Sequence, residues 1–374
     1  MPCDYQKLPH KGIRDLKPYI PGKSIEELGQ EKKITDIIKL ASNENPLGCS
    51  SNVISAIAKL TGLKIATYPA PASHPLNRKL SEKLAIPENK LFLSNGSDSL
   101  FSLLLTIFGL HTNKHILTHD YAFISYRIQA QILGIPVKSS PVLTSWEVDI
   151  EAMIKLADTN TALIFLANPN NPTGLLIPLE KIRHLLKKIS AGTIVVLDEA
   201  YYEYAYQDEP GALSLLQEFP NLVVSRTFSK AYGLAGLRLG YAIAHPDIIN
   251  LLYKVQLPFS VNQVALTAGA AALEDEEFLT STLALNIQGL KQVEQGLIDL
   301  NLSYLPSVGN FITFDCGMQS EPIYKKLLEK GIIVRPLDNY GLTSHLRVSI
   351  GLPEHNTRFL DNLAISLKEG KSYE

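Results

Sequence analysis

Residues 162–201 read ALIFLANPNNPTGLLIPLEKIRHLLKKISAGTIVVLDEAY, and this stretch decides the class of fold. Its two ends, 162–167 and 193–197, are continuous apolar runs, which are typical of strands covered on both faces. The segment 179–189 between them has the pattern of a helix. A strand, a helix and a strand in this order predict a βαβ unit with two parallel strands.

The same alternation extends to both sides of this unit. Short apolar runs, separated by longer helical stretches, predict further strands at 91–93, 115–118 and 222–225. The order of these elements is that of an α/β protein, in which helices connect neighbouring strands. We therefore expect a large domain that is built on a mostly parallel sheet.

The two ends of the chain have a different character. The first 45 residues are rich in Pro, Gly and Lys and are predicted to form an extended arm. Beyond about residue 260 the chain is helical in pattern as far as 299, and short strands are then predicted near 310–314, 332–335 and 345–349. We expect an N-terminal arm over 1–45, a large domain over 46–260, and a small α+β domain over 261–374 that includes part of the arm.

Composition excludes several classes of protein. The chain has 374 residues, which is ample for two domains. Its 35 Lys and Arg against 37 Asp and Glu give a net charge of −2, which predicts no broad basic surface for nucleic acid. The three cysteines form neither a disulfide framework nor a Cys-x-x-Cys zinc pair. The N-terminus has no apolar signal stretch, and the most apolar window, 100–110, is too short to span a bilayer. We therefore expect a cytoplasmic enzyme with neither a membrane nor a nucleic-acid partner.

Ligands of parallel α/β sheets bind at the carboxyl ends of the strands, so residues after each strand are the first site candidates. The turn at 95–98, NGSD, opens a helix, and its N–H groups and hydroxyl would make an anion site. A simple helix cap is the alternative explanation of this turn. The loop NPNNPTG at 168–174 is, by itself, ordinary turn chemistry.

Charged side chains follow the next two strands. Asp198 ends an apolar run, so we expect it to be buried and paired. Glu199 is predicted to be a solvated loop carboxylate instead. The strand at 222–225 leads into Lys230, and a glycine-rich segment with Arg238 follows. Hydroxyls beside a lysine and an arginine on such a turn suit a phosphate and a reactive amine.

Together, these strand ends match the needs of pyridoxal phosphate. That cofactor requires a lysine for its Schiff base, a carboxylate for its ring nitrogen, phosphate anchors and phenolic partners. The sequence has neither a GxSxG elbow nor a GxGxxG turn after a predicted strand. This absence disfavours a serine hydrolase and a dinucleotide-dependent enzyme. His111, His115 and His119 recur at a spacing that suits metal ligands on a helix, but a turn and a strand are predicted there. We therefore expect no metal site.

Longer motifs extend this interpretation. They are LASNENPLG at 40–48, Tyr-Pro at 68–69, NPNNPTG at 168–174, DEAY at 198–201, SRTFSKAYGLAGLRLGY at 225–241, IIVRPL at 332–337 and LRVSIG at 346–351. Over nearly the whole chain, the sequence resembles the fold-type-I, class-II pyridoxal-phosphate-dependent aminotransferases and, within them, the histidinol-phosphate aminotransferase family. The resemblance implies a large domain with a mostly parallel sheet and a smaller α+β domain.

The resemblance also implies roles in holding the cofactor. Lys230 would form the Schiff base, Asp198 would pair with the pyridine nitrogen, and Tyr201 would bond the cofactor O3′ together with Asn171. Tyr121 would stack on the ring, within a His119-Asp120-Tyr121 segment that stands where the family more often has Pro-Thr-Tyr. The phosphate would be held by Gly96, Ser97, Asp98, Thr227, Ser229 and Arg238.

Other residues would serve the substrate and a second subunit. Tyr68 would reach the phosphate in the neighbouring subunit, which implies a homodimer with shared active sites. Arg347 would take an anionic group of the substrate, and Arg335 is a second family arginine nearby. Tyr19 and Asn43 lie in segments of the arm that would close over the substrate.

The implied reaction converts L-histidinol phosphate and 2-oxoglutarate into imidazole acetol phosphate and L-glutamate, in histidine biosynthesis. Alternatives remain open at this point. The same scaffold serves aromatic amino-acid aminotransferases and a threonine-phosphate decarboxylase, and a non-catalytic relative would act as a binding protein. The presence of Lys230, Asp198 and Arg238 argues against a silent relative.

Overall fold

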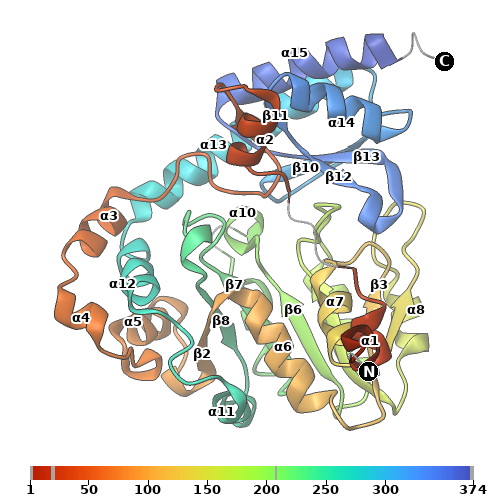
Figure 1. Cartoon of the computed structure of the whole chain (residues 1–374). Coiled ribbons are helices and arrows are strands. Elements are labelled where there is room, and N and C mark those ends of the chain that lie inside the picture. The colour runs from red at the N-terminus through yellow and green to blue at the C-terminus, as the bar shows by residue number, and fades with distance from the viewer. Residues whose placement is uncertain (1–2, 18–21, 207–208, 371–374) are drawn as a thin grey trace.

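The computed structural model describes residues 3–17, 22–206 and 209–370, and a seven-stranded sheet lies at its centre (Figure 1). The strands are β2 (Leu91–Ser94), β3 (His115–His119), β4 (Val137–Ser140), β5 (Thr161–Ala167), β6 (Ile194–Asp198), β7 (Leu222–Thr227) and β8 (Gly240–Ile243). Their order in space is β2-β8-β7-β6-β5-β3-β4, and of these seven only β8 runs antiparallel to its neighbours. The prediction of a mostly parallel sheet is therefore confirmed.

Helices cover both faces of this sheet. One face carries α6 (Gly96–Phe108), α7 (Ser125–Ile132) and α11 (Pro246–Val255). The other carries α3 (Ser51–Ala58), α5 (Pro75–Leu84), α8 (Ile150–Leu156), α9 (Leu179–Lys188) and α12 (Gln263–Ala272). On β5, Phe165 packs against the helices of the first face, and its neighbour Leu166 packs against those of the other face. Burial on both faces is the reason why these strands are continuously apolar.

A smaller domain, blue in Figure 1, lies across the carboxyl ends of the large sheet. Its antiparallel sheet has the order β12-β13-β10-β9, made of β12 (Arg335–Leu337), β13 (Leu342–Ser349), β10 (Phe311–Asp315) and β9 (Tyr304–Leu305). The helices α13 (Glu276–Asp299), α14 (Ser320–Glu329) and α15 (Pro353–Gly370) pack on it. The expected short strands near 310–314, 332–335 and 345–349 all fall in this domain.

The first 45 residues are more structured than an extended arm. They contain α1 (Lys11–Arg14), α2 (Ile25–Lys32) and β1 (Ile38–Lys39), and β1 pairs in parallel with β11 (Ile332–Ile333). Leu28 of α2 packs against Leu328 and Ile333 of the small domain. A capping box of Ser24 and Glu27 begins α2, and this was a readable signal in the sequence. Segment 25–41 is thus attached to the small domain.

The boundary expected at residue 261 lies too early. Val261, Ala265 and Leu266 belong to the core of the large domain, whereas the core of the small domain begins at Val293, within α13. The strands β4 and β8 were also missed, because β4 is a half-buried edge strand and β8 lies in a glycine-rich motif that was read as a turn. None of the helices in the described ranges combines the length and the apolar character that crossing a membrane requires.

Candidate active site

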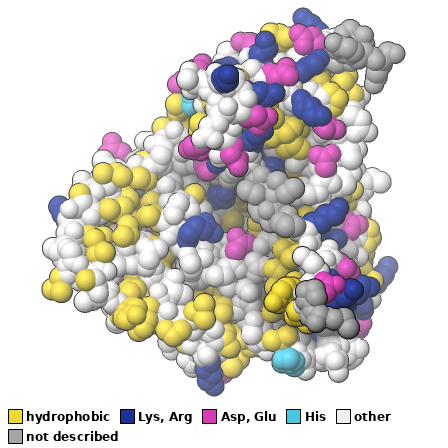
Figure 2. All heavy atoms as spheres, viewed as in Figure 1, with side chains coloured by type: hydrophobic (Ala, Val, Ile, Leu, Met, Phe, Trp, Pro, Cys, Tyr) yellow, Lys and Arg dark blue, Asp and Glu magenta, His cyan; other side chains and the backbone are white. Residues whose placement is uncertain are grey.

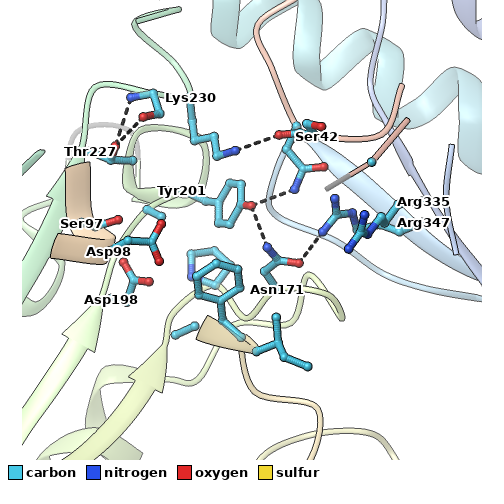
Figure 3. A pocket seen from close by; sticks show the side chains of 18 of the residues that line it. Ser42, Ser97, Asp98, Asn171, Asp198, Tyr201, Thr227, Lys230, Arg335 and Arg347 are labelled. Carbon is cyan, nitrogen blue, oxygen red and sulfur yellow. Dashed lines mark hydrogen bonds between the residues drawn. The ribbon is translucent and has the colours of Figure 1, made fainter. Parts of the chain in front are cut away.

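A cavity opens at the carboxyl ends of β5, β6 and β7, below the small domain, and residues from both domains line it (Figure 3). The lining residues include twelve of the sequence candidates: Asn43, Ser97, Asp98, Asn171, Asp198, Tyr201, Thr227, Ser229, Lys230, Arg238, Arg335 and Arg347. Parallel strands bring their ends to one edge of the sheet, which is why motifs far apart in the chain meet here.

Lys230 projects into this cavity from the loop after β7. Its Nζ donates a hydrogen bond to the carbonyl oxygen of Ser42, at 2.9 Å. Burial lowers the pKa of Lys230 to about 8, and the nearby cation of Arg347 adds to this effect. The neutral amine, which a nucleophile and proton carrier requires, therefore forms at a lower pH than on an ordinary lysine.

Asp198 ends β6 with one carboxylate oxygen held and the other facing the cavity. Its Oδ2 accepts a hydrogen bond from the Tyr126 hydroxyl, at 2.8 Å. Its Oδ1 is buried and has no hydrogen-bond partner among the described residues. Burial raises the pKa of Asp198 to about 7, and the carboxylate of Asp98 raises it further. A positively charged ring nitrogen beside Oδ1 would restore the ionised form.

The Tyr201 hydroxyl accepts two hydrogen bonds, one from Asn43 Nδ2 at 2.7 Å and one from Asn171 Nδ2 at 3.3 Å. Both lone pairs of its oxygen are thereby used, which leaves the phenolic proton to donate to an acceptor in the cavity. Burial raises the pKa of Tyr201 to about 12, so this proton stays in place. The amide of Asn43 is also bonded to the Ser349 hydroxyl. Asn43 thus orients Tyr201, and its expected part in closing over the substrate stays a prediction.

The three asparagines of the NPNNPTG loop do different work. Asn168 closes the loop on itself through the backbone of Ile177, and it also bonds the Tyr206 hydroxyl. Asn170 bonds the backbone of Tyr121. Only Asn171 reaches the cavity, because its neighbours turn inward to hold the loop.

One end of the cavity is suited to an anion. The helix α6 begins at Gly96, and the side chain of its N-cap residue makes no capping hydrogen bond, so the first N–H groups are left for another acceptor. A Cβ atom on Gly96, whose φ is +72°, would lie 2.6 Å from Arg238 Nη2. Glycine therefore lets the guanidinium lie over the helix end. The hydroxyls of Thr227 and Ser229 bond each other at 3.0 Å beside it.

Asp98 belongs to this helix end, but it does not offer a charge that suits a phosphate. Its carboxylate accepts a hydrogen bond from the Ser125 hydroxyl. A role for Asp98 in phosphate binding is thus limited to its backbone N–H group at the helix end.

Arg335 and Arg347 lie beside each other on neighbouring strands of the small-domain sheet, since they are paired in the antiparallel register of β12 and β13 (Figure 3). Arg347 is 7% exposed, and it donates to Asn171 Oδ1 at 2.5 Å and to the Ala41 carbonyl at 2.6 Å. Like charges directly opposite each other are unfavourable in a sheet. An anion bound between the two guanidinium groups would therefore stabilise this pair of arginines.

Two sequence expectations are wrong. Tyr121 does not line the cavity: its ring lies 5.1 Å from that of Trp146, and Phe123, two residues on, lines the cavity in its place. Glu199 is not solvated but fully buried. Its Oε2 accepts two hydrogen bonds from Arg226, at 2.9 and 2.8 Å, and its Oε1 accepts the N–H of Ala212.

Two further candidates lie away from this cavity. Tyr68 is 80% exposed and stacks on Phe259 with ring centroids 4.3 Å apart, so it does not reach the cavity of its own chain. Tyr19 lies outside the described residues. The cavity also includes Ile124, Asn339 and Tyr340, which lie outside the motifs, and Ser42, which lies in the motif at 40–48 but was not a site candidate.

These residues fit one kind of cofactor. The Oδ1 of Asp198 calls for a cationic nitrogen, the end of α6 with Arg238 calls for an anion, and Lys230 lines the same cavity. A flat ring that carries a phosphate and a basic nitrogen meets all three demands, and Phe123 offers it an apolar surface.

Comparison with known proteins agrees with this geometry. The family model described as aminotransferase class I and II matches residues 35–363. The chain is 57% identical to histidinol-phosphate aminotransferase 2 of Legionella pneumophila (strain Lens) over 364 residues, which are 97% of this chain and 99% of that protein. It is 43% identical to a protein of the same name from Pseudomonas fluorescens over 367 residues, 97% of this chain and 98% of the relative.

A solved structure has the same fold. The crystal structure of histidinol-phosphate aminotransferase from Sinorhizobium meliloti in complex with pyridoxal-5'-phosphate matches this chain with a TM-score of 0.87 and 25% sequence identity. The match covers 97% of this chain and 98% of the other.

Proposed function

Since the chain belongs to the class I and II aminotransferases and, within them, to the histidinol-phosphate aminotransferase family, we propose that it moves the amino group of L-histidinol phosphate to 2-oxoglutarate. The products are imidazole acetol phosphate and L-glutamate, in histidine biosynthesis. The observation that carries the proposal is the pair of arginines, Arg335 and Arg347, that shares one cavity with Lys230.

The cofactor of this proposal is pyridoxal phosphate. When bound, it supplies an aldehyde that condenses with amines and a ring that withdraws electrons from the substrate carbon. Asp198 would hold the ring nitrogen protonated through Oδ1, and the Tyr201 proton would bond the ring oxygen. Arg238, with the hydroxyls of Thr227 and Ser229, would hold the phosphate. Phe123 would cover one face of the ring, the role that the sequence had given to Tyr121.

Lys230 would then act twice. Its neutral amine would hold the cofactor aldehyde, and once a substrate amine had displaced it, the same amine would serve as the base that moves the proton of the substrate Cα. A pKa of about 8 suits both roles, because the amine must be unprotonated to accept a proton and must release that proton again.

The arginine pair explains how one site serves two substrates in turn. Histidinol phosphate carries a phosphate and no carboxylate, whereas glutamate carries two carboxylates. A guanidinium pairs bidentately with either group, so two adjacent arginines accept both. We also propose that the enzyme works in the cytoplasm, the location that the composition of the sequence favours.

The proposed assembly is a homodimer. Exposed apolar side chains gather over α3, α4 (Gly62–Ala66) and the 257–259 loop, where Figure 2 shows a hydrophobic patch. Its members are Ile54, Leu63, Ile65, Tyr68, Leu257 and Phe259, each more than half exposed. Contiguous apolar surface of this kind is typical of a subunit interface. Tyr68 would lie within the interface and reach the cavity of the other subunit.

A screen of amino donors tests the proposed reaction. The pyridoxal-loaded enzyme is mixed with histidinol phosphate, phenylalanine, tyrosine or threonine phosphate, and the cofactor absorbance is followed through a single half-reaction. We expect the highest kcat/KM for histidinol phosphate. A higher value for an aromatic amino acid, or release of carbon dioxide from threonine phosphate, would assign the enzyme to one of the alternative reactions.

A further inference from the structure

The carboxylate of Asp198 is held from behind by one side chain. Its Oδ2 accepts a hydrogen bond from the Tyr126 hydroxyl at 2.8 Å, and its Oδ1, on a residue that lines the cavity, has no hydrogen-bond partner among the described residues. A carboxylate rotates freely about its Cβ–Cγ bond unless one oxygen is tied. The direction in which Oδ1 points is therefore set by Tyr126, a residue that does not line the cavity.

Tyr126 is itself immobilised. It is fully buried near the start of α7, and its ring lies between three phenylalanines. It stacks on Phe165 at 4.9 Å and meets Phe101 and Phe123 edge-on at 5.0 and 5.6 Å. A ring packed in this way keeps its hydroxyl in one place, so the hydrogen bond to Asp198 is directed by the core rather than by a flexible side chain.

The charge around Asp198 makes this hydrogen bond important. Burial and the carboxylates of Asp98 and Glu199 all raise the pKa of Asp198, whereas the bond from Tyr126 and, to a smaller extent, the backbone N–H of Ala200 lower it. Burial together with the Asp198 charge raises the pKa of Tyr126 well above its ordinary value, so the phenol remains a donor. On the neighbouring residue, Ser125 holds Asp98 in the same manner. The start of α7 thus controls both carboxylates of the cavity.

We propose that Tyr126 is a positioning residue of the transaminase, which keeps Asp198 ionised and aims its Oδ1 at the ring nitrogen of the cofactor. The inference rests on the proposed function, because it assumes that the ring nitrogen lies beside Oδ1. The hydrogen bond from the Tyr126 phenol to the carboxylate would then help to keep the cofactor ring protonated. If the Tyr126 hydrogen bond is removed, the proton between the ring nitrogen and Asp198 should shift toward the Asp198 carboxylate.

The test compares Tyr126→Phe with Tyr206→Phe. Tyr206 serves as the control, because its substitution also removes one buried phenol oxygen, which accepts a hydrogen bond from Asn168 Nδ2 at 2.8 Å, and no hydrogen bond joins it to the Asp198 carboxylate. The pyridoxal-loaded proteins are titrated by visible absorbance, which reports the protonation of the linkage to Lys230. We expect the midpoint of Tyr126→Phe to move to higher pH, because a neutral ring leaves that linkage more basic. The midpoint of Tyr206→Phe should stay at the wild-type value.

Binding and rate give second readouts. Loss of a hydrogen bond to a charged group should weaken cofactor binding by about tenfold and lower kcat by about tenfold or more, with KM for the donor little changed. In an Asp198→Asn background, Tyr126→Phe should cause almost no further loss, since the charge it supports has gone. If Tyr126→Phe alone does not fold, Asp198→Asn should restore folding for the same reason.

Two outcomes would overturn the inference: equal titration midpoints for Tyr126→Phe and the wild type, or additive losses in the double variant. They are distinct from failure of the proposed function. If the proposed function were wrong, the wild-type protein itself would show no absorbance from bound pyridoxal phosphate, or no transamination with any donor.

Discussion

Lys230 and Asp198 are charged groups in a buried cavity, and the pKa of each has moved toward neutrality. The pKa of the lysine falls to about 8 and that of the aspartate rises to about 7, in both cases chiefly because burial disfavours the charged form. Two perturbed groups of opposite type in one cavity indicate an active site more specifically than either motif alone.

The shift on Lys230 predicts how capture of the cofactor depends on pH. The nucleophile is the neutral amine, and a lowered pKa makes that form dominant above about pH 8 instead of above the usual range. The rate at which cofactor-free protein reacts with pyridoxal phosphate should therefore rise with pH and level off above about 8. Stopped-flow absorbance measures this rate. A rate that keeps rising to the pKa of an ordinary lysine would contradict the shift.

Replacement of the lysine separates chemistry from cofactor binding. Lys230→Ala should abolish turnover but still bind pyridoxal phosphate non-covalently, because Thr227, Ser229 and Arg238 hold the phosphate. Loss of a covalent catalytic group removes several orders of magnitude in rate. A variant that keeps more than about one per cent of the wild-type kcat would argue for another residue in this role.

The arginine pair makes a prediction about both half-reactions. Arg347→Ala should lower kcat/KM for histidinol phosphate and for glutamate together, each by about 10- to 100-fold, because one guanidinium serves both anions. Arg183→Ala, which removes only surface ion pairs, is the control. Damage to the glutamate half-reaction alone would mean that the donor does not use Arg347.

At the scale of elements, a buried ion pair ties the ends of β6 and β7 together. Glu199 and Arg226 are almost completely buried, and Arg226 also lies over the ring of Tyr202 at 3.3 Å. Each of these residues is next to a cavity residue, Asp198 or Thr227. The pair thus maintains the spacing of the two strand ends on which the carboxylate and the phosphate anchors stand.

Breaking that pair should cost stability. Glu199→Gln leaves Arg226 buried with a weaker partner, and we expect the free energy of unfolding to fall by about 3–5 kcal/mol. Glu321→Gln, in an ion pair with Lys325 that is about two-thirds exposed, should change it by less than about 1 kcal/mol. Urea unfolding of the three proteins measures the difference. Equal effects of the two substitutions would show that the buried pair contributes no more than a surface pair.

At the scale of the whole molecule, the position of Tyr68 predicts that two subunits complete each site. A chain with Lys230→Ala and a chain with Tyr68→Ala should each be weak or inactive, while a mixture should regain activity. A hybrid dimer has one site with both residues intact, so recovery of up to about a quarter of the wild-type activity is expected when exchange is random. No recovery after verified subunit exchange would contradict shared sites.

Local patterns in the sequence determined the class of fold and most of the cavity. The runs at 162–167 and 193–197 are apolar because both faces of the strands are buried, so they could be recognised without a structure. Residues that follow such strands meet at one edge of the sheet, and Asn171, Asp198 and Lys230 line one cavity there. These features depend on neighbours along the chain, which a sequence contains.

The tertiary structure alone decided which side chains face one another. Three aromatics lie between 121 and 126, but only packing turns Phe123 to the cavity, Tyr121 toward Trp146 and Tyr126 onto Asp198. Glu199 has the sequence context of a loop carboxylate, yet it is buried and paired with Arg226, which lies 27 residues later in the chain. The physical reason is the same in each case. The direction and the charge state of a side chain depend on partners brought together by folding, and no local pattern specifies those partners.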